Sequence, residues 1–367
     1  MGVSPTLALQ AGQRCTIESF PNSRRTAMER TIHNQRTARE AGTQLPGSEP
    51  PFVAASQRIA MVHNPRSHRN KGRQAERVDG VDITIVQPRT KDELAEALAQ
   101  LRDDGVEFLI INGGDGTIRD VLTMGQVVFG ENWPTLAVLP RGKTNALNVD
   151  LGAPSDWSLS AAVEAFRSSK RVQRRALTVA REGSDELPML GFILGAGAFT
   201  LGIEAGQDAH RIGFFDSLAV GATAAWGVLQ VLFGTNANRW RRGTAMRLAY
   251  EPSGEPMPHS PHGDPARRHI ILATTLQRMP MGIQLFGKSQ APIRLAILDR
   301  PRRRIFASLP AILSGWHPDW LSSAGLHQIS AEAFSIDLEA PFILDGEHFP
   351  AGRYHIDQGP ELTFVTA

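Results

Sequence analysis

Between residues 58 and 150, short runs of consecutive apolar residues alternate with stretches of helical spacing. The clearest helical stretch is Lys91–Leu101, where leucines recur three and four residues apart. Continuous apolar runs are typical of parallel strands covered on both faces. The alternation therefore predicts an α/β domain built on a parallel sheet. Its expected strands are Ile59–Val62, Ile83–Val86, Phe108–Ile111 and Leu136–Leu139.

The strand pattern changes after about residue 175. Apolar and polar residues now mostly alternate, and turn residues separate the runs, which indicates an antiparallel β-sandwich domain. The only long helical candidate is Phe214–Phe233, interpreted as a buried or half-buried helix and not as a membrane span. The expected strands include Leu177–Val179, Met246–Tyr250, Ile270–Leu272, Ile293–Ile297, Phe334–Leu338 and Leu362–Val365.

These changes predict three segments. Residues 1–55 show no sustained apolar period and are expected to be a disordered tail. Residues 56–175 are expected to form the α/β nucleotide-binding domain, and residues 176–367 the β-rich domain.

Composition excludes several classes of function. The formal charge is +2, from 39 basic and 37 acidic residues, which is too balanced for a dedicated nucleic-acid binder. The single cysteine, Cys15, excludes an internal disulfide framework and any multi-cysteine zinc or iron–sulfur site. No window reaches the roughly 20 apolar residues of a spanning helix. We expect a cytoplasmic protein that is at most peripheral to a membrane.

The loop after the third strand is the strongest candidate for a binding site. It reads Asn-Gly-Gly-Asp-Gly-Thr and precedes a helix. Glycines let backbone N–H groups approach an anion closely, and the helix directs its positive end to the same place. An aspartate here can hold a metal or a ribose hydroxyl, and a threonine can cap the helix while donating to a phosphate. We predict nucleotide phosphate binding by Gly113, Gly114, Asp115, Gly116 and Thr117.

The loop after the fourth strand contains a misleading signal. Gly142-Lys143-Thr144 resembles the end of a P-loop, but the first glycine of that motif is replaced by Ala137 inside the strand. Pro140 and Arg141 favour a tight turn. A true P-loop is therefore not expected.

The third candidate is Asp345-Gly346-Glu347, near the end of the chain. Alone, this pattern is typical of a hairpin turn with solvated acids. Together with a phosphate-binding loop, one carboxylate can accept the proton of an attacking hydroxyl while the other steers that acid or a metal.

In order and spacing, these motifs resemble the diacylglycerol kinase/sphingosine kinase superfamily of lipid kinases. The resemblance includes Asn64-Pro65 after the first strand and covers most of residues 58–350. It implies an α/β domain and a β-sandwich lipid domain with ATP and Mg²⁺ between them. It further implies transfer of the γ-phosphoryl group of ATP to a primary hydroxyl of diacylglycerol, a sphingoid base or a ceramide. By position, the nucleotide cleft would be lined by Asn64, Gly142, Thr144 and Asn145, and Glu347 would accept the proton beside Asp345.

The chain departs from the pattern of this superfamily at three positions. Lys143 stands where a threonine is usual, Ala146 where an acid is frequent, and Asp120 where a glutamate is usual. Two alternatives stay open: a kinase of soluble substrates similar to NAD kinase, and a catalytically degenerate relative that only binds nucleotide or lipid.

The expected partner is a lipid substrate at the inner membrane face, with peripheral membrane contact and no nucleic acid; a homodimer is left open. The basic run Asp299–Arg304 is interpreted either as a solvated face or as a surface for anionic headgroups. Trp316 and Trp320 are expected in the core more than at a membrane.

Overall fold

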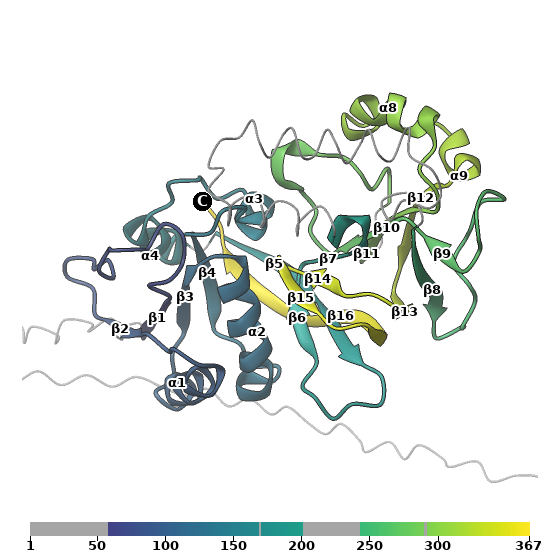
Figure 1. The fold of residues 1–367 in the computed structure, drawn as a ribbon. Coiled ribbons are helices and arrows are strands. Elements are labelled where there is room, and N and C mark those ends of the chain that lie inside the picture. The colour runs from purple at the N-terminus through teal and green to yellow at the C-terminus, as the bar shows by residue number, and fades with distance from the viewer. Residues whose placement is uncertain (1–57, 169, 201–242, 290–291) are drawn as a thin grey trace, which may run out of the picture. The chain divides into compact units, whose positions relative to one another are not determined.

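The computed structural model describes residues 58–168, 170–200, 243–289 and 292–367, all of which belong to one compact unit, Ala55–Ala367 (Figure 1). The expected tail, residues 1–55, and the expected helix Phe214–Phe233 lie outside the described residues. Among the helices that the structure describes, none combines the length and the apolar character needed to cross a bilayer.

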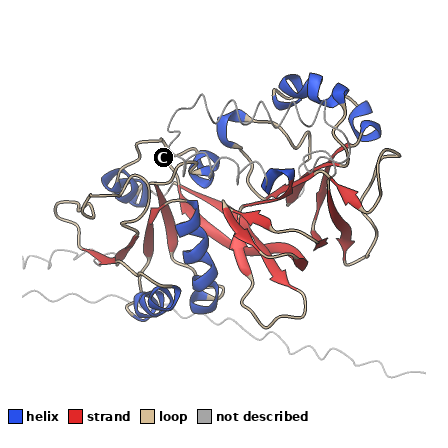
Figure 2. Cartoon of the chain, viewed as in Figure 1, coloured by secondary structure: helices blue, strands red, loops and turns tan. Residues whose placement is uncertain are grey.

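The first half of the described chain forms the predicted parallel sheet. Its strand order is β2-β1-β3-β4, and all three pairings are parallel. The strands are β1 (Ile59–His63), β2 (Ile83–Val86), β3 (Phe108–Gly113) and β4 (Thr135–Pro140). Helices lie against these strands (Figure 2), and the buried side chains form separate clusters that include Leu98 and Val121 in one and Trp157 and Phe166 in the other.

Two helices of this half begin where the sequence supplies a capping side chain. α1 (Lys91–Asp103) follows Thr90, whose hydroxyl accepts from Glu93 N at 3.1 Å. α4 (Leu159–Arg167) follows Ser158, which accepts from Ala161 N at 3.2 Å. Such side chains satisfy amide donors that the first helical turn leaves free. The other two helices, α2 (Asp115–Phe129) and α3 (Ala146–Leu151), start at the candidate site.

The parallel sheet continues into antiparallel strands through β16 (Gly352–Val365), which lies parallel to β4 and pairs Phe364 with Leu136. On its other pairings β16 is antiparallel to β5 (Arg171–Arg181) and to β13 (Ala333–Leu338). The domain boundary expected after residue 175 therefore falls inside β5. The same sheet includes β6 (Met189–Gly191), β8 (Thr244–Glu251) and β9 (Arg267–Arg268).

A second sheet is antiparallel throughout, in the order β12-β11-β10-β7-β14-β15. Apolar side chains of both sheets, such as Leu295 and Ile356, share one buried cluster. The predicted fold class, an α/β parallel-sheet domain followed by antiparallel β structure, is confirmed. The strands are β7 (Ile193–Gly197), β10 (Ile270–Thr274), β11 (Ile293–Leu298), β12 (Leu326–Ala331), β14 (Phe342–Leu344) and β15 (Glu347–Phe349).

The helices α8 (Arg303–Leu313) and α9 (Trp320–Ala324) pack against the end of β11 and the start of β12, through Leu298 and Leu326. The 3₁₀ turn η1 (Pro280–Gly282) precedes β11. Ile305 and Ile312 of α8 are buried with Leu321 of α9. The expectation of a core position is wrong for Trp316, which is 49% exposed.

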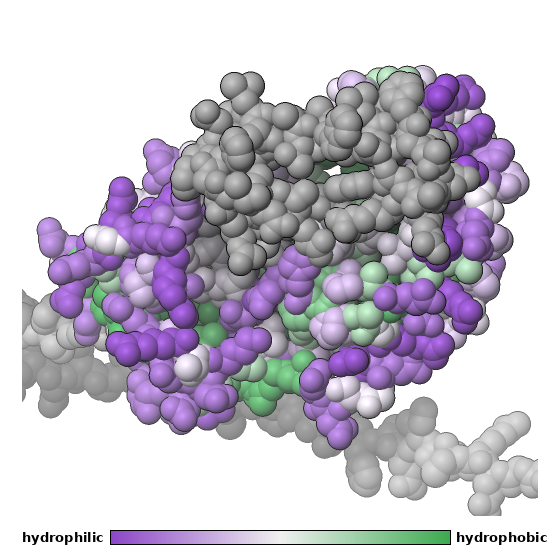
Figure 3. All heavy atoms as spheres, in the orientation of Figure 1, coloured by the Kyte–Doolittle hydropathy of each residue, from purple (hydrophilic) through white to green (hydrophobic). Residues whose placement is uncertain are grey.

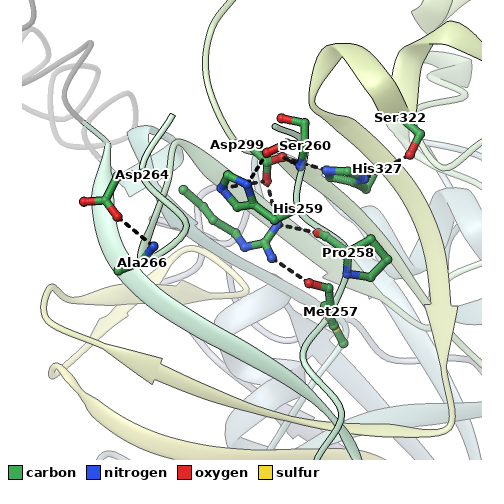
Figure 4. A network of polar contacts seen from close by, with 10 residues as sticks. Met257, Pro258, His259, Ser260, Asp264, Ala266, Asp299, Ser322 and His327 are labelled. Carbon is green, nitrogen blue, oxygen red and sulfur yellow. Dashed lines mark hydrogen bonds and ion pairs between the residues drawn. The ribbon is translucent and has the colours of Figure 1, made fainter. Parts of the chain in front are cut away.

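A buried carboxylate fixes the base of these helices. Asp299 accepts from Arg268 Nη1 at 2.5 Å and from Ser260 N at 2.7 Å, and its Oδ2 lies 2.7 Å from His327 Nε2 (Figure 4). The other ring nitrogen of His327 lies 3.2 Å from Ser322 Oγ of α9. Burial alone would raise the pKa of Asp299, but the hydrogen bonds from His327 and Ser260 and the nearby positive charges lower it overall.

Candidate active site

Three loops meet beyond the carboxyl ends of β1, β3 and β4, where ligands bind in sheets of this kind. Asn64 N donates to Asn112 O at 3.0 Å, and Asn64 Nδ2 donates to Thr117 Oγ1 at 2.8 Å. Arg141 N donates to Gly113 O at 3.2 Å. The structure thus brings Asn64, the glycine loop and the Gly142–Asn145 loop together.

Two glycines are required where these loops touch. A Cβ on Gly114 would lie 2.9 Å from Gly142 Cα, and a Cβ on Gly113 would lie 2.4 Å from Thr117 Cβ. Both distances are too short for any side chain, so the Gly142 backbone can approach Gly114, and the Thr117 side chain can approach Gly113, only because no Cβ is present. α2 starts at Asp115 with Gly114 as its N-cap, and no side chain caps it. Thr117 N already donates to Gly114 O at 2.9 Å, so the amides of Asp115 and Gly116 are the first-turn donors left for an anion.

Asp115 and Asn145 build this cradle. Asp115 Oδ2 accepts from Asn145 N at 3.0 Å, and its Oδ1 accepts from Ala146 N at 2.9 Å. Asn145 has a left-handed backbone with φ 52°, and its Oδ1 accepts from Gly142 N at 2.7 Å. Burial raises the pKa of Asp115, although the two amides oppose the shift. Both side chains therefore determine the shape of the loop, while Lys143 and Thr144 are exposed.

Asp345 and Gly346 form the two-residue turn between β14 and β15. Both have positive φ, 48° and 84°, which suits a tight hairpin with an Asp-Gly pair. The Asp345 carboxylate accepts from Ile193 N at 2.9 Å and from Phe192 N at 3.0 Å. Burial, and to a smaller extent the charge of Asp115, raises the pKa of Asp345 to about 7. The carboxylates of Asp345, in the hairpin, and Asp115, in the glycine loop, are thus close enough for their charges to interact.

Glu347 forms an ion pair with Arg119, a residue of α2. Arg119 also pairs with Asp120 at 2.8 Å, and its side chain is only 4% exposed, whereas that of Glu347 is 54% exposed. Burial alone would lower the pKa of Arg119, but these carboxylates raise it, so the guanidinium remains charged. The helix that begins at the glycine loop therefore holds the predicted proton acceptor.

Sequence reasoning missed Arg119 and Asp150. Asp150 lies in α3 and is fully buried; its Oδ2 accepts from Arg174 Nε at 2.5 Å. Its Oδ1 accepts from the amides of Gln277 and Arg278 at 2.6 and 2.7 Å. In the sequence, Arg119 lies between Ile118 and Asp120, and Asp150 lies between Val149 and Leu151; neither pattern reveals a distant partner.

Comparison with known families agrees with this geometry. Residues 58–179 match the family model described as Diacylglycerol kinase catalytic domain, and this segment contains the three strand-end loops and α2. This segment is thus similar to that family, which confirms the resemblance to the diacylglycerol kinase/sphingosine kinase superfamily.

Curated relatives match a shorter part of the chain. Lipid kinase YegS of Escherichia coli (strain K12) is 33% identical over 78 residues, or 21% of this chain and 26% of that protein. A probable lipid kinase YegS-like of Citrobacter koseri is 35% identical with the same coverage. The chain thus spans about a quarter of the length of these relatives.

Solved structures match over a larger part of the chain. A diacylglycerol kinase structure from Bacillus anthracis str. Sterne has a TM-score of 0.54 at 12% identity, and one of a putative diacylglycerol kinase from the same organism has 0.56 at 13%. Each comparison covers 85% of this chain and 97% of the other, so it shows that the fold is shared.

Proposed function

We propose that this protein is an ATP-dependent lipid kinase. It transfers the γ-phosphoryl group to a primary hydroxyl of a lipid of the diacylglycerol, sphingoid base or ceramide class. The observation that carries the proposal is the ion pair between Glu347 and Arg119, because it joins the acid to the helix that starts at the phosphate cradle. In this proposal the enzyme is cytoplasmic and reaches its substrate from the inner membrane face.

The residues divide the work between binding and proton transfer. The amides at the start of α2 and the close-packed glycines bind the phosphates of ATP. Glu347 accepts the proton of the lipid hydroxyl as its oxygen attacks the γ-phosphorus, and ADP leaves. More than half of the Glu347 side chain is exposed, so an incoming hydroxyl has access to it. Preorganised amides stabilise the charge on the moving phosphoryl group without rearranging.

The carboxylates of the candidate site fit a Mg²⁺ ion that binds together with ATP. No group of three or more His, Cys, Asp or Glu residues forms a metal cage within the described ranges. Mg²⁺ usually keeps several waters and binds through one or two carboxylates together with substrate phosphates. Asp115 and Asp345 would supply those carboxylates, because each oxygen that accepts a backbone amide keeps a second lone pair. Bound there, the ion would neutralise charge on the β- and γ-phosphates.

The test is a transfer assay with labelled ATP over diacylglycerol, monoacylglycerol, sphingosine and ceramide in mixed micelles. We expect label in one lipid class. We expect Glu347→Gln to lower the rate by about 100-fold or more. The matched control is Glu131→Gln, at an exposed glutamate, which should leave the rate unchanged.

Other outcomes would select the alternatives. Transfer to NAD without detergent, and none to lipid, would identify a soluble-substrate kinase similar to NAD kinase. Binding of ATP or lipid without transfer to any acceptor would identify a catalytically degenerate relative.

A further inference from the structure

Large apolar side chains are exposed on three elements that contact one another. Of the four that are exposed in the described part of the chain, three lie on α3, η1 and the segment after α8. They are Met281 at 90%, Trp316 at 49% and Val149 at 37% exposure; the fourth, Val127, is on α2. We call these three residues the apolar strip.

The elements of the apolar strip are held together by defined contacts. η1 packs against α3, and Asp150 of α3 binds the amides of Gln277 and Arg278 just before η1. Just after η1, Gln284 N donates to Leu313 O at 3.0 Å, at the last residue of α8. Trp316, the exposed tryptophan, follows three residues after Leu313. The strip is therefore a fixed surface.

Met281 occupies an unfavourable position for a large side chain. Its backbone is left-handed, with φ 58° and ψ 16°, a region that non-glycine residues rarely adopt outside Asn and Asp. Such strain persists mainly at functional positions. Exposure of the methionine side chain to water is unfavourable, whereas its transfer to an apolar medium lowers the free energy.

Basic residues border the apolar strip. Arg302 and Arg304 lie at the start of α8, and the Arg304 guanidinium is 3.8 Å from the centre of the Trp320 ring. Trp320 in turn meets Trp316 edge to face, with ring centres 6.0 Å apart. Residues 275–325 contain seven Lys or Arg and only two Asp, and one of these, Asp299, is buried. Figure 3 shows pale green and deep purple atoms side by side where α8 lies in Figure 1.

Exposed apolar side chains bordered by arginines are suited to binding an anionic bilayer. Tryptophan partitions to the membrane interface, and arginines bind anionic headgroups. The apolar strip is also close to the candidate site, because α3 has six residues, a length of about 9 Å. α3 starts at Ala146, whose amide is bound by Asp115. A lipid hydroxyl in a bilayer at the strip would need to move only a short distance to reach the glycine loops.

We propose that Val149, Met281 and Trp316, together with Arg302 and Arg304, form the surface that docks on an anionic lipid bilayer. Its purpose, to deliver a lipid to the site, rests on the proposed function. The binding itself does not, and it can be measured without any turnover.

The first test is co-sedimentation of the full chain with phosphatidylcholine vesicles, with and without phosphatidylglycerol. We expect the protein to bind the anionic vesicles and to be released by salt, since headgroup attraction is screened. Replacing Arg302 and Arg304 by Gln should weaken partitioning about fivefold per arginine. The control with the same charge change is Arg73→Gln with Arg77→Gln, at two exposed arginines remote in sequence, and it should bind as the wild type does.

The second test uses Met281→Asn. Asn tolerates the left-handed backbone better than Met does, so the thermal unfolding temperature should hold or rise while vesicle binding falls. A purely structural role for Met281 predicts no change in binding. Val127→Ser removes a similarly exposed apolar side chain from α2 and should leave binding intact.

The proposal is overturned if the wild type does not bind anionic vesicles, or if the double arginine variant binds them as well as the wild type does. It is also overturned if Met281→Asn converts a dimer to a monomer in gel filtration without affecting vesicle binding, since a second copy would then cover the strip. A wild type that binds vesicles but phosphorylates no lipid would refute the proposed function and leave this surface standing.

Discussion

Arg119 forms ion pairs with both Asp120 and Glu347, and so connects α2 to the β14–β15 hairpin. Its guanidinium also lies 5.6 Å from the centre of the Phe349 ring, which belongs to the same hairpin. A buried cation between two carboxylates is a strong geometric constraint. We infer that Arg119 positions Glu347 relative to the phosphates that, in the proposed function, bind at the start of α2.

A double-mutant cycle tests this positioning role. Arg119→Met keeps an apolar stem beside Phe349 but removes both ion pairs. We expect kcat to fall by about ten- to 100-fold, with the KM for ATP little changed, because a misplaced base slows only the chemical step. In a Glu347→Gln background the same substitution should cost almost nothing. Equal losses in both backgrounds would show that Arg119 does not act through Glu347.

Asp115→Asn should affect nucleotide binding more than turnover. The asparagine keeps one acceptor oxygen and places an NH₂ group where Oδ1 or Oδ2 accepts an amide of Asn145 or Ala146. We expect a raised KM for ATP and a loss of about 1–3 kcal/mol in the free energy of unfolding. Enzyme kinetics and urea unfolding measure the two effects, with the exposed Asp92→Asn as control. A loss confined to kcat would instead assign Asp115 to the chemical step.

The raised pKa of Asp345 predicts a specific pH dependence. Because its pKa is about 7 in the folded protein and about 3.9 in an unfolded chain, the folded state binds the proton more tightly. The stability that Asp345 contributes is therefore complete below about pH 4 and is lost as pH rises through about 7. Asp345→Asn removes this titration, so its unfolding temperature should rise relative to the wild type between pH 5 and 8. A constant difference across that range would contradict the assignment.

Asp299 predicts the opposite dependence, because its pKa is lowered in the folded protein. Its contribution is present above about pH 3.9, the pKa of an unfolded aspartate, and is lost as pH falls through the lower folded value. At neutral pH, Asp299→Asn should cost about 3–5 kcal/mol, because Arg268 would stay buried without its ion-pair partner. The cost should shrink on acidification, as measured by denaturant unfolding from pH 7 to 3. The exposed Asp319→Asn should show neither effect.

The parallel half of the fold and its loops could be predicted because their signals are local. Continuous apolar runs define β1, β3 and β4, and the carboxyl ends of parallel strands meet at one edge. The convergence of Asn64, the glycine loop and Asn145 follows from that rule alone. The hairpin at Asp345 was likewise recognisable from its Asp-Gly pair.

Partners far apart in the chain were not predictable. In the sequence, Arg119 is one polar residue among others on a helix, and its partners in the β14–β15 hairpin become visible only in the fold. Asp150 binds amides that are more than 120 residues away in the chain. α8 contains Pro310, which weakens its helical pattern, and its packing on α9 and on the ends of β11 and β12 stabilises it. The exposure of Trp316 has the same origin, because the tertiary contacts of α8 and α9 decide which tryptophan is covered.

The position of β16 has a consequence for how the protein is made. The edge of β4 is completed by Phe364, so a ribosome must reach residue 364 before the parallel sheet can close. Until then the nascent α/β half presents an unpaired strand to the crowded cell, where such edges recruit other chains. Chaperones that bind nascent chains would therefore be most important during that interval.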